Sequence, residues 1–473
     1  MKKIVSMFLF FCVSSILVFS QSDDDLFGDD NLFGDDGIEI VEEVTAKDSL
    51  SQGTLFENGS IKIGGTFNTS LSTLTTLFSD DGNSFTDNLS DTTLTPTLSA
   101  FLTLDARPTQ TLRMYTKFGM KYPFTDAAAG VLDPSKLSLR SSMDPSIFGD
   151  SDPVLLNISN WFYLKELFTD FSIADRAFFR FGFHTVTWGT GYFFSPVSDM
   201  INTSSINPED TEAQVDGALN LRAQIVFPDT QNCLWLYVIP SDEFNLGGTD
   251  TYLKKTAFAA KGDIVFGSWE FGLGGYWKYQ DAPKVMMTAS RSLKKINMFG
   301  EFVYNYGSGS EWAANSDWDN KTSIIQATVG CSYYWKDPMI TFAAQYYYDG
   351  TNYKLKNLTD AEFVKDYFYK GHNFAVLANF GRLFGSTDFT AMAFGMVNFG
   401  RGDLLDKSAP AELQKAVENV DQYFSAAIIS AMLYYSPVKD LKFGIGPYIT
   451  VSDWNSSPVV SLKLSANLGG GSF

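Results

Sequence analysis

From Ser60 to the end of the chain, apolar and polar side chains alternate at every second position in one run after another. Such alternation predicts β-strands that have one apolar face and one polar face. Roughly 18 runs of this kind can be marked out. They lie near residues 60–74, 92–105, 111–123, 154–168, 176–190, 215–227, 232–240, 254–266, 269–280, 283–292, 295–307, 321–335, 338–350, 371–382, 387–399, 422–435, 440–451 and 457–469.

Short connections alternate with longer ones along almost the whole chain. The short ones include residues 106–109, 228–231, 267–268, 292–294, 336–337 and 436–439, and the long ones include 78–91, 123–153, 191–214, 241–254, 308–320, 351–370 and 400–423. Outer-membrane β-barrels have short periplasmic turns and long extracellular loops. We therefore predict an all-β fold, a transmembrane antiparallel β-barrel of about 18 strands. About 16 strands is the alternative, because connections 281–283 and 452–456 are short where long loops are expected.

The two faces of a single hairpin support the barrel. In residues 254–280, one face carries Trp269, Phe271, Leu273, Trp277 and Tyr279, and the other carries Glu270, Tyr276, Lys278 and Gln280. We expect the first face to meet lipid and the second to meet water. An aromatic-rich β-sandwich is the competing interpretation, but this many paired strands would then require several domains.

The first 20 residues have the anatomy of a secretory signal peptide. Lys2 and Lys3 precede an apolar run that ends in small residues, which predicts cleavage before Gln21. A lipoprotein signal that uses Cys12 is disfavoured, since Phe10 and Phe11 stand where small residues are needed. We expect the mature chain in the bacterial outer membrane.

Residues 21–59 form an acidic segment. The chain has a formal net charge of −19, and about half of it comes from residues 21–48, which contain eleven carboxylates and a single basic residue, Lys47. The run Asp25–Asp30, with the order Asp-Leu-Phe-Gly-Asp-Asp, is followed by Asn31–Asp36, with Asn-Leu-Phe-Gly-Asp-Asp. Such composition predicts disorder. The repeat is interpreted either as a docking segment for a periplasmic partner or as a solvated spacer.

Composition removes other classes of protein. Downstream of the signal peptide, no apolar stretch approaches the about 20 residues that a transmembrane helix needs. Only 2 histidines are present, and neither His184 (with Ser195 or Asp199 nearby) nor His372 stands in a recognisable catalytic frame. We predict no enzyme, no catalytic residues, no metal and no cofactor. Cys233 and Cys331 fall on strands that are not neighbours, so no disulfide is predicted.

One stretch resembles a known family. The order Arg180-Phe181-Gly182 leads into Trp188-Gly189-Thr190-Gly191, and Pro196 and Asp199 follow. This order, with the segment 215–240 after it, resembles a motif of porin-like outer-membrane β-barrels. The resemblance covers residues 176–240 and implies a channel-forming or substrate-uptake barrel. The acidic repeat is similar in character to exported spirochaete proteins.

The same motif suggests a local structure. Glycines at Gly189 and Gly191 permit a sharp turn or a close approach of the backbone. A loop that starts near Pro196 and Asp199 could then fold inward and narrow the pore. The alternative is a bulge at the barrel rim, with Trp188 in the aromatic girdle.

A barrel of this size leaves an aqueous channel, and charged positions on predicted inner faces are the candidates for its lining. They are Arg113, Lys117, Lys121, Arg180, His184, Arg222, Glu270, Lys278 and Glu301, with Lys261, Arg291, Asp105 and Glu166 also placed inside. Basic groups inside a channel favour anions, although ion pairing explains much of the pattern. We predict a porin-like channel for passive or weakly selective diffusion of small hydrophilic solutes, with an anion preference. A surface adhesin and a fatty-acid-like uptake barrel are the alternatives.

Several further expectations complete the picture. Residues 409–424 have helical spacing and are predicted to form a short helix on a loop. Phe473 suits the aromatic last residue of a barrel assembly signal, but Gly469–Ser472 does not, so that signal is altered. The expected partners are outer-membrane lipid, the barrel assembly machinery and small hydrophilic solutes, without nucleic acid. A homo-oligomer remains an open alternative.

Overall fold

The chain divides by its internal contacts into residues Met1–Ser49 and Leu50–Phe473, and all described residues belong to the second unit. The predicted signal peptide, the acidic repeat and the helix at 409–424 lie outside the described residues. The computed structural model describes residues 54–58, 60–79, 88–89, 92, 94–122, 162–174, 176–186, 188–200, 218–240, 256–308, 311–312, 317–319, 321–350, 371–399, 426–438, 441–451 and 457–472.

Strands make up almost all of the described chain. They are β1 (Thr54–Asn58), β2 (Ile61–Phe78), β3 (Leu94–Thr109), β4 (Leu112–Tyr122), β5 (Phe162–Ile173), β6 (Ala177–His184), β7 (Ala218–Val226), β8 (Cys233–Ile239), β9 (Ala257–Phe266), β10 (Trp269–Lys278), β11 (Lys284–Leu293), β12 (Ile296–Tyr306), β13 (Ser323–Trp335), β14 (Ile340–Asp349), β15 (His372–Phe380), β16 (Phe389–Phe399), β17 (Ala426–Val438), β18 (Leu441–Val451) and β19 (Val459–Ser472). A short 3-10 helix, η2, covers Ser198–Met200. Within these ranges, no helix has the length and apolar character to cross a membrane.

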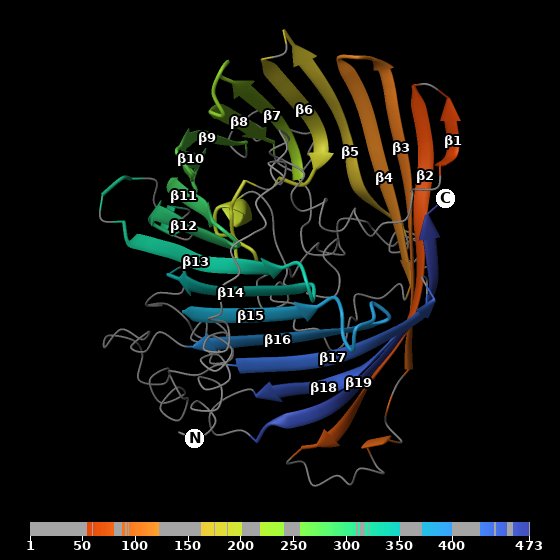
Figure 1. The fold of residues 1–473 in the computed structure, drawn as a ribbon. Helices are drawn as coiled ribbons and strands as arrows, with labels where there is room; N and C mark the ends of the chain where they lie inside the picture. The colour runs from red at the N-terminus through yellow and green to blue at the C-terminus, as the bar shows by residue number, and fades with distance from the viewer. Residues whose placement is uncertain are drawn as a thin grey trace, which may run out of the picture. The chain divides into compact units, whose positions relative to one another are not determined.

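The sheet is a closed antiparallel barrel. Each strand from β2 to β18 pairs with the next strand in the chain, and β19 pairs back onto β2. The sheet has 19 strands, of which β1 extends along β2 and the other 18 form the ring (Figure 1). The prediction of 18 strands is confirmed, and the alternative of 16 is wrong. Strands β10 and β11 pair directly, as do β18 and β19, so the short connections at these two places do not reduce the number of strands.

Connections differ between the two ends of the barrel as predicted. At one end the strands are joined by residues 110–111, 174–176, 227–232, 267–268, 294–295, 336–339, 381–388 and 439–440, and both the start of β2 and the end of β19 lie there. The connections at the other end are mostly long. At the two-residue turn between β9 and β10, Gly267 has a φ of 63°, a conformation that glycine adopts without strain.

Strand β1 begins the sheet earlier than the predicted start at Ser60. It pairs with β2 from Asn58↔Ile61 to Thr54↔Gly64. Strand β19 pairs with β2 only from Thr66 onward. Because β1 and β19 pair with successive stretches of β2, β1 continues the line of β19 along this strand.

Register is regular over most of the ring. Irregularities occur between β1 and β2, β3 and β4, β4 and β5, β17 and β18, and β19 and β2. The pairings from β5 through β17 run without a shift. Because side chains alternate between faces, an unshifted ladder keeps each residue on one defined side of the wall.

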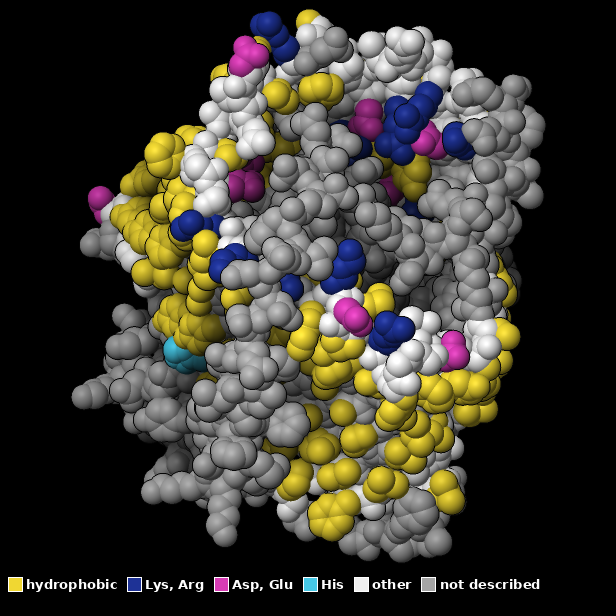
Figure 2. All heavy atoms as spheres, in the orientation of Figure 1, with side chains coloured by type: hydrophobic (Ala, Val, Ile, Leu, Met, Phe, Trp, Pro, Cys, Tyr) yellow, Lys and Arg dark blue, Asp and Glu magenta, His cyan; other side chains and the backbone are white. Residues whose placement is uncertain are grey.

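The outer face is apolar. On β10, Leu273 and Trp277 are exposed to 60% and 45%, whereas Tyr276 on the opposite face is 9% exposed. The two faces predicted for this hairpin are confirmed. Figure 2 shows apolar side chains spread over the left and lower edges of the molecule, while most charged side chains in that view lie toward its middle and upper part.

Candidate functional site

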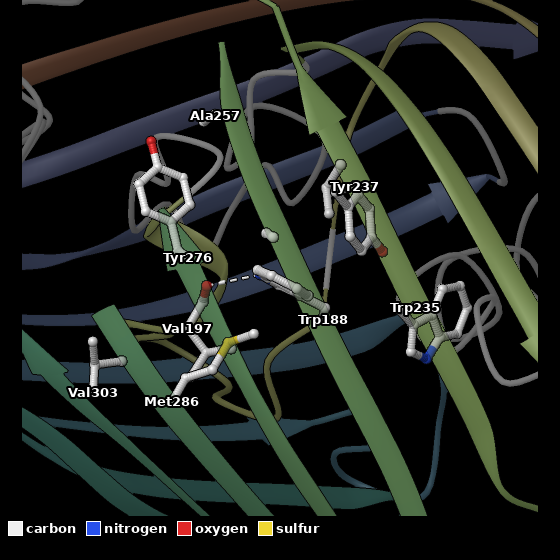
Figure 3. Packing of buried hydrophobic residues seen from close by; sticks show 10 residues of the cluster. Trp188, Val197, Trp235, Tyr237, Ala257, Tyr276, Met286 and Val303 are labelled. Carbon is white, nitrogen blue, oxygen red and sulfur yellow. Dashed lines mark hydrogen bonds between the residues drawn. The ribbon is translucent and has the colours of Figure 1, made fainter. Parts of the chain in front are cut away.

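The segment that follows β6 lies inside the barrel. Trp188 is buried, and its Nε1 donates a hydrogen bond of 2.8 Å to the carbonyl oxygen of Val197 (Figure 3). The Ser198 hydroxyl oxygen accepts the N–H of Gly189 at 3.0 Å. These bonds fold the described residues 188–200, here named the inner segment, into a compact turn.

Glu301, on β12, anchors the inner segment to the wall. Its carboxylate accepts the backbone N–H groups of Thr190, of Gly191 at 2.6 Å and of Val197 at 3.0 Å. The hydroxyl of Ser195 donates to the same carboxylate at 3.0 Å. A buried carboxylate is stable only when its oxygens are satisfied in this way. Glu301 therefore holds the inner segment at several points with one side chain.

Gln345, on β14, is a second anchor two strands away. Its Oε1 accepts the N–H groups of Tyr192 at 3.0 Å, Phe193 at 2.6 Å and Phe194 at 3.3 Å. Its Nε2 donates to the Phe194 carbonyl at 2.5 Å and to the Thr328 hydroxyl at 2.6 Å. The amide thus satisfies the polar backbone where the segment reaches farthest from β6.

Two glycines of the motif allow this close approach. A Cβ atom added at Gly189 would stand 1.9 Å from the Ser195 hydroxyl and 2.5 Å from the Glu301 carboxylate. At Gly191 it would stand 1.9 Å from the Phe194 carbonyl. The segment folds inward, as the first of the two hypotheses expected, and Trp188 is not a residue of the outer girdle.

Apolar side chains of the inner segment cover part of the inner wall. Val186, Trp188 and Val197 share one buried cluster with side chains of β8 to β12, which are Trp235, Tyr237, Ala257, Ala259, Tyr276, Met286 and Val303 (Figure 3). Phe193 and Phe194 pack on a second cluster from β14 to β17, formed by Ala343, Ala375, Leu377, Met392, Phe394, Met396 and Ile428. The segment therefore lines one side of the barrel interior.

Charged side chains occupy another part of the inner wall, where arginines pair with aspartates. Arg113 on β4 donates to Asp105 on β3 at 3.0 and 3.1 Å. Arg180 on β6 donates to Asp170 on β5 at 2.6 and 3.0 Å, and its guanidinium lies 3.9 Å from the centre of the Phe168 ring. Two-pronged pairs of this kind fix the position of both groups.

Arg222, on β7, differs from these two arginines. It lies opposite Arg180 in the strand pairing, and its guanidinium stands 5.4 Å from the centre of the Trp235 ring. Its Nε has no hydrogen-bond partner. Among the arginines on the described inner wall, Arg222 is the one that forms no ion pair.

Lys261, on β9, connects the charged wall to the inner segment. Its Nζ stands 2.9 Å from a carboxylate oxygen of Asp263 and donates to the Trp188 carbonyl at 2.7 Å. The other carboxylate oxygen of Asp263 accepts from Trp235 Nε1 at 2.7 Å. A buried lysine is tolerated here because the aspartate and the carbonyl both satisfy it.

Most of the predicted pore-lining residues lie on the inner face of the barrel. Arg113, Lys117, Arg180, Arg222, Glu270 and Lys278 alternate with outward apolar residues and lie on the inner face. The side chain of Lys121 lies outside the described residues.

Three predictions need correction. His184 is fully buried against Phe168, and Glu301 is 4% exposed, so neither contacts the channel space. Arg291 lies on the outer face, because it pairs with Trp269 and shares its side of β11 with Val285 and Met287. It stands near the turn that follows, and its guanidinium lies 5.2 Å from the centre of the Trp269 ring. A long side chain at such a position can reach the interface.

Gln345 and Asp170 were not among the sequence candidates. The available signal for Gln345 was an isolated amide within the run Phe342-Ala343-Ala344-Gln345-Tyr346. Its partners lie about 150 positions earlier, so no feature of the neighbouring sequence indicates the contact. In the described part of the chain, no group of three His, Cys, Asp or Glu side chains could hold a metal ion.

No protein-family model matches the sequence, and no curated protein matches it. Among solved structures, OccK9 (OpdG) of Pseudomonas aeruginosa is 10% identical with a TM-score of 0.49, over 87% of this chain and 98% of that one. A BenF-like porin from Pseudomonas fluorescens Pf-5 is 8% identical with a TM-score of 0.48, over 87% and 98%. OccAB4 of Acinetobacter baumannii is 11% identical with a TM-score of 0.44, over 89% and 99%. Likenesses of this size assign no function, which has to be inferred from the chain's own residues.

Proposed function

We propose that this chain is a channel of the bacterial outer membrane through which small hydrophilic solutes diffuse. The observation that carries the proposal is a closed sheet with an apolar outer face and a polar, charged inner face. In lipid, a β-sheet has to close on itself, since no water is available to satisfy an open edge. A ring of this many strands is too wide for its own side chains to fill, so water occupies the centre.

The inner segment is the constriction of the proposed channel. It is held on the interior of β8 to β17 by Glu301, Gln345 and two apolar clusters. Solutes therefore pass on the other side, along the inner faces of β2 to β7 and β19. Because the segment is anchored by many hydrogen bonds, it acts as a fixed wall of the passage.

The barrel ends support an orientation. Short turns together with both ends of the ring mark the periplasmic side in outer-membrane barrels, and the strands show this arrangement. We infer that the turns at 267–268 and 294–295 face the periplasm. Export through a cleaved signal peptide, assembly by the barrel machinery and a periplasmic partner for residues 21–59 belong to the same proposal.

A weak preference for anions follows from the inner charges. Arg113 and Arg180 are each neutralised by an aspartate, while Arg222 has no carboxylate partner. One unneutralised guanidinium beside the passage favours anions over cations. The adhesin and fatty-acid-uptake alternatives depend on long loops and on an N-terminal plug, which lie outside the described residues.

Planar-bilayer recording tests the channel proposal. We expect the refolded protein to insert and give discrete conductance steps in potassium chloride, with a reversal potential in a salt gradient that shows modest anion preference. Polymers of graded size should stop entering above a cut-off set by the constriction. Protein kept unfolded in denaturant and diluted in the same detergent is the control. Stable insertion without conductance steps would overturn the proposal.

A further inference from the structure

Phe384, in the connection between β15 and β16, occupies a position that its turn does not favour. The backbones of Leu383 and Ser386 bond to each other in both directions, at 3.2 and 2.9 Å, so Phe384 and Gly385 form a two-residue turn. Their φ angles are 52° and 79°. Turns with two positive φ angles favour Asn-Gly, and a bulky side chain at the first position is strained. The geometry of the turn therefore does not explain the phenylalanine.

The ring of Phe384 lies against the outer wall of the barrel. It is 85% exposed, more than any other large apolar side chain in the described part of the chain. Its centre stands 5.9 Å from that of Phe389, edge to face, and Phe389 stacks on Tyr435 at 4.7 Å. Phe389 and Tyr435 are paired residues of β16 and β17, on the face opposite Met392 of the second apolar cluster. The turn thus folds toward the lipid-facing side.

A second connection places an aromatic ring on the outer wall at the other end of the barrel. Trp318, between β12 and β13, is 59% exposed and stacks on Tyr306 at 6.1 Å. The Tyr306 hydroxyl donates to the Trp318 carbonyl at 2.6 Å. Trp312 donates through Nε1 to the Tyr306 carbonyl at 2.6 Å and meets the Trp318 ring edge-on at 4.9 Å. Tyr306 shares the outer face of β12 with exposed Phe302, so Trp318 is fixed beside that face.

Charged neighbours limit how deeply the two rings can enter a membrane. Asp317 and Asp319 flank Trp318 and are exposed, and exposed Arg382 and Asp388 belong to the same connection as Phe384. Charged groups are costly in hydrocarbon, whereas aromatic rings are enriched at the boundary between hydrocarbon and water. Both rings therefore suit the headgroup layer better than the hydrocarbon core.

We propose that Phe384 and Trp318, here named the rim aromatics, insert into the lipid headgroup layers, one at each end of the barrel. Each continues the apolar outer face that the strands present to lipid, and each belongs to a connection instead of a strand. Contact with lipid offsets the exposure of an apolar ring and, at Phe384, the strain of the turn. The proposal goes beyond the channel function, because solute passage does not require it.

Fluorescence of the folded protein in vesicles tests lipid contact directly. Phe384→Trp adds one indole, and Trp318→Phe removes one while keeping a ring beside Tyr306. We expect the emission gained in the first variant and lost in the second to be quenched by phosphatidylcholine brominated near the headgroup. Lipid brominated near the chain ends and iodide in the water should quench both much less. Trp277→Phe gives the reference for a lipid-facing residue of the wall, since Trp277 is 45% exposed on β10.

Urea titration in the same vesicles separates the ring from the turn. Asparagine suits a positive φ better than phenylalanine, so a residue with only a turn role would gain stability in Phe384→Asn. We expect this variant to unfold at a lower urea concentration instead. Lys294→Asn is the matched control, because Lys294 has a φ of 57° in the short turn between β11 and β12. It should unfold at the same or a higher urea concentration.

The results that would overturn the proposal differ between the two ends. Unchanged or increased urea resistance in Phe384→Asn, with no quenching of Phe384→Trp by brominated lipid, would refute lipid contact at that end. Quenching of Trp318 by iodide and not by brominated lipid would refute it at the other end, and would indicate a surface for an extracellular ligand. Neither result bears on the proposed channel, which conductance tests separately.

Discussion

The carboxylate of Glu301 accepts the backbone N–H of Gly191 at 2.6 Å, although 110 positions separate the two residues in the chain. Glu301 stands on β12, and Gly191 lies shortly after β6. The bond therefore crosses the barrel interior and joins the inner segment to a wall six strands farther along the ring. Removing the acceptor should free the segment from that wall.

For this reason we expect Glu301→Gln to loosen the constriction. The amide has one acceptor oxygen in place of two, and its NH2 group would face backbone donors, at a cost of about 1–3 kcal/mol. Single-channel recording should show higher open-channel noise and a larger mean conductance. Glu270→Gln is the matched control, because Glu270 is exposed on the inner face and contacts no part of the inner segment. Equal noise in the two variants would contradict the anchoring role.

Gly191→Ala should destabilise the same segment by a steric route. The new Cβ would stand 1.9 Å from the Phe194 carbonyl, so the turn has to open. We expect a loss of about 1–3 kcal/mol in the free energy of unfolding, measured by urea titration in vesicles. Gly262→Ala serves as control, since its Cβ would meet nothing closer than 4.0 Å. If both variants unfold at the same urea concentration, close packing at Gly191 is refuted.

The orientation of the strands can be tested by placing a charge on each face. Leu273→Arg puts a guanidinium on the apolar outer side and should cost up to about 2–4 kcal/mol near the bilayer centre. Ser465→Arg places the same group on the accessible inner wall, where water solvates it and the cost should be small. Folding yields and urea midpoints in vesicles report both. A larger cost at Ser465 would invert the proposed inside and outside of the barrel.

Asp170 should control the charge balance of the passage. Asp170→Asn removes the partner of Arg180 and frees a second guanidinium beside Arg222. We expect the reversal potential in a salt gradient to shift toward stronger anion preference. Combining Asp170→Asn with Arg180→Gln should return it close to the original value. An unchanged reversal potential in the single variant would show that this pair lies away from the ion path.

Strand number, end polarity and the two faces were predictable from the sequence because they depend on local alternation. The run from Trp269 to Gln280 shows both faces of one strand without any knowledge of its neighbours. Arg291 was placed wrongly although the alternation indicates its side, because it is in phase with Val285 and Met287, which face outward. Its face was assigned from charge, whereas the register of β11 with β10 decides it.

The hydrogen bonds that anchor the inner segment could not be predicted from the sequence, for a different reason. Glu301 could be placed on an inner face, but its hydrogen bonds to residues 190–197 depend on how a loop crosses the barrel. Gln345 gave only the weak signal of one amide in an apolar strand. The glycines at 189 and 191 did indicate a close approach, although not the side chains that would meet them.

The unshifted ladder from β5 through β17 carries both anchors. Slipping either β12 or β14 by a single residue against its neighbours would rotate Glu301 or Gln345 out toward hydrocarbon and leave the inner segment untethered. The bore of the barrel thus depends on faithful strand pairing during assembly, and a mispaired barrel would be a wider and less selective hole. All of the irregular pairings lie elsewhere, in strands that bear no anchor.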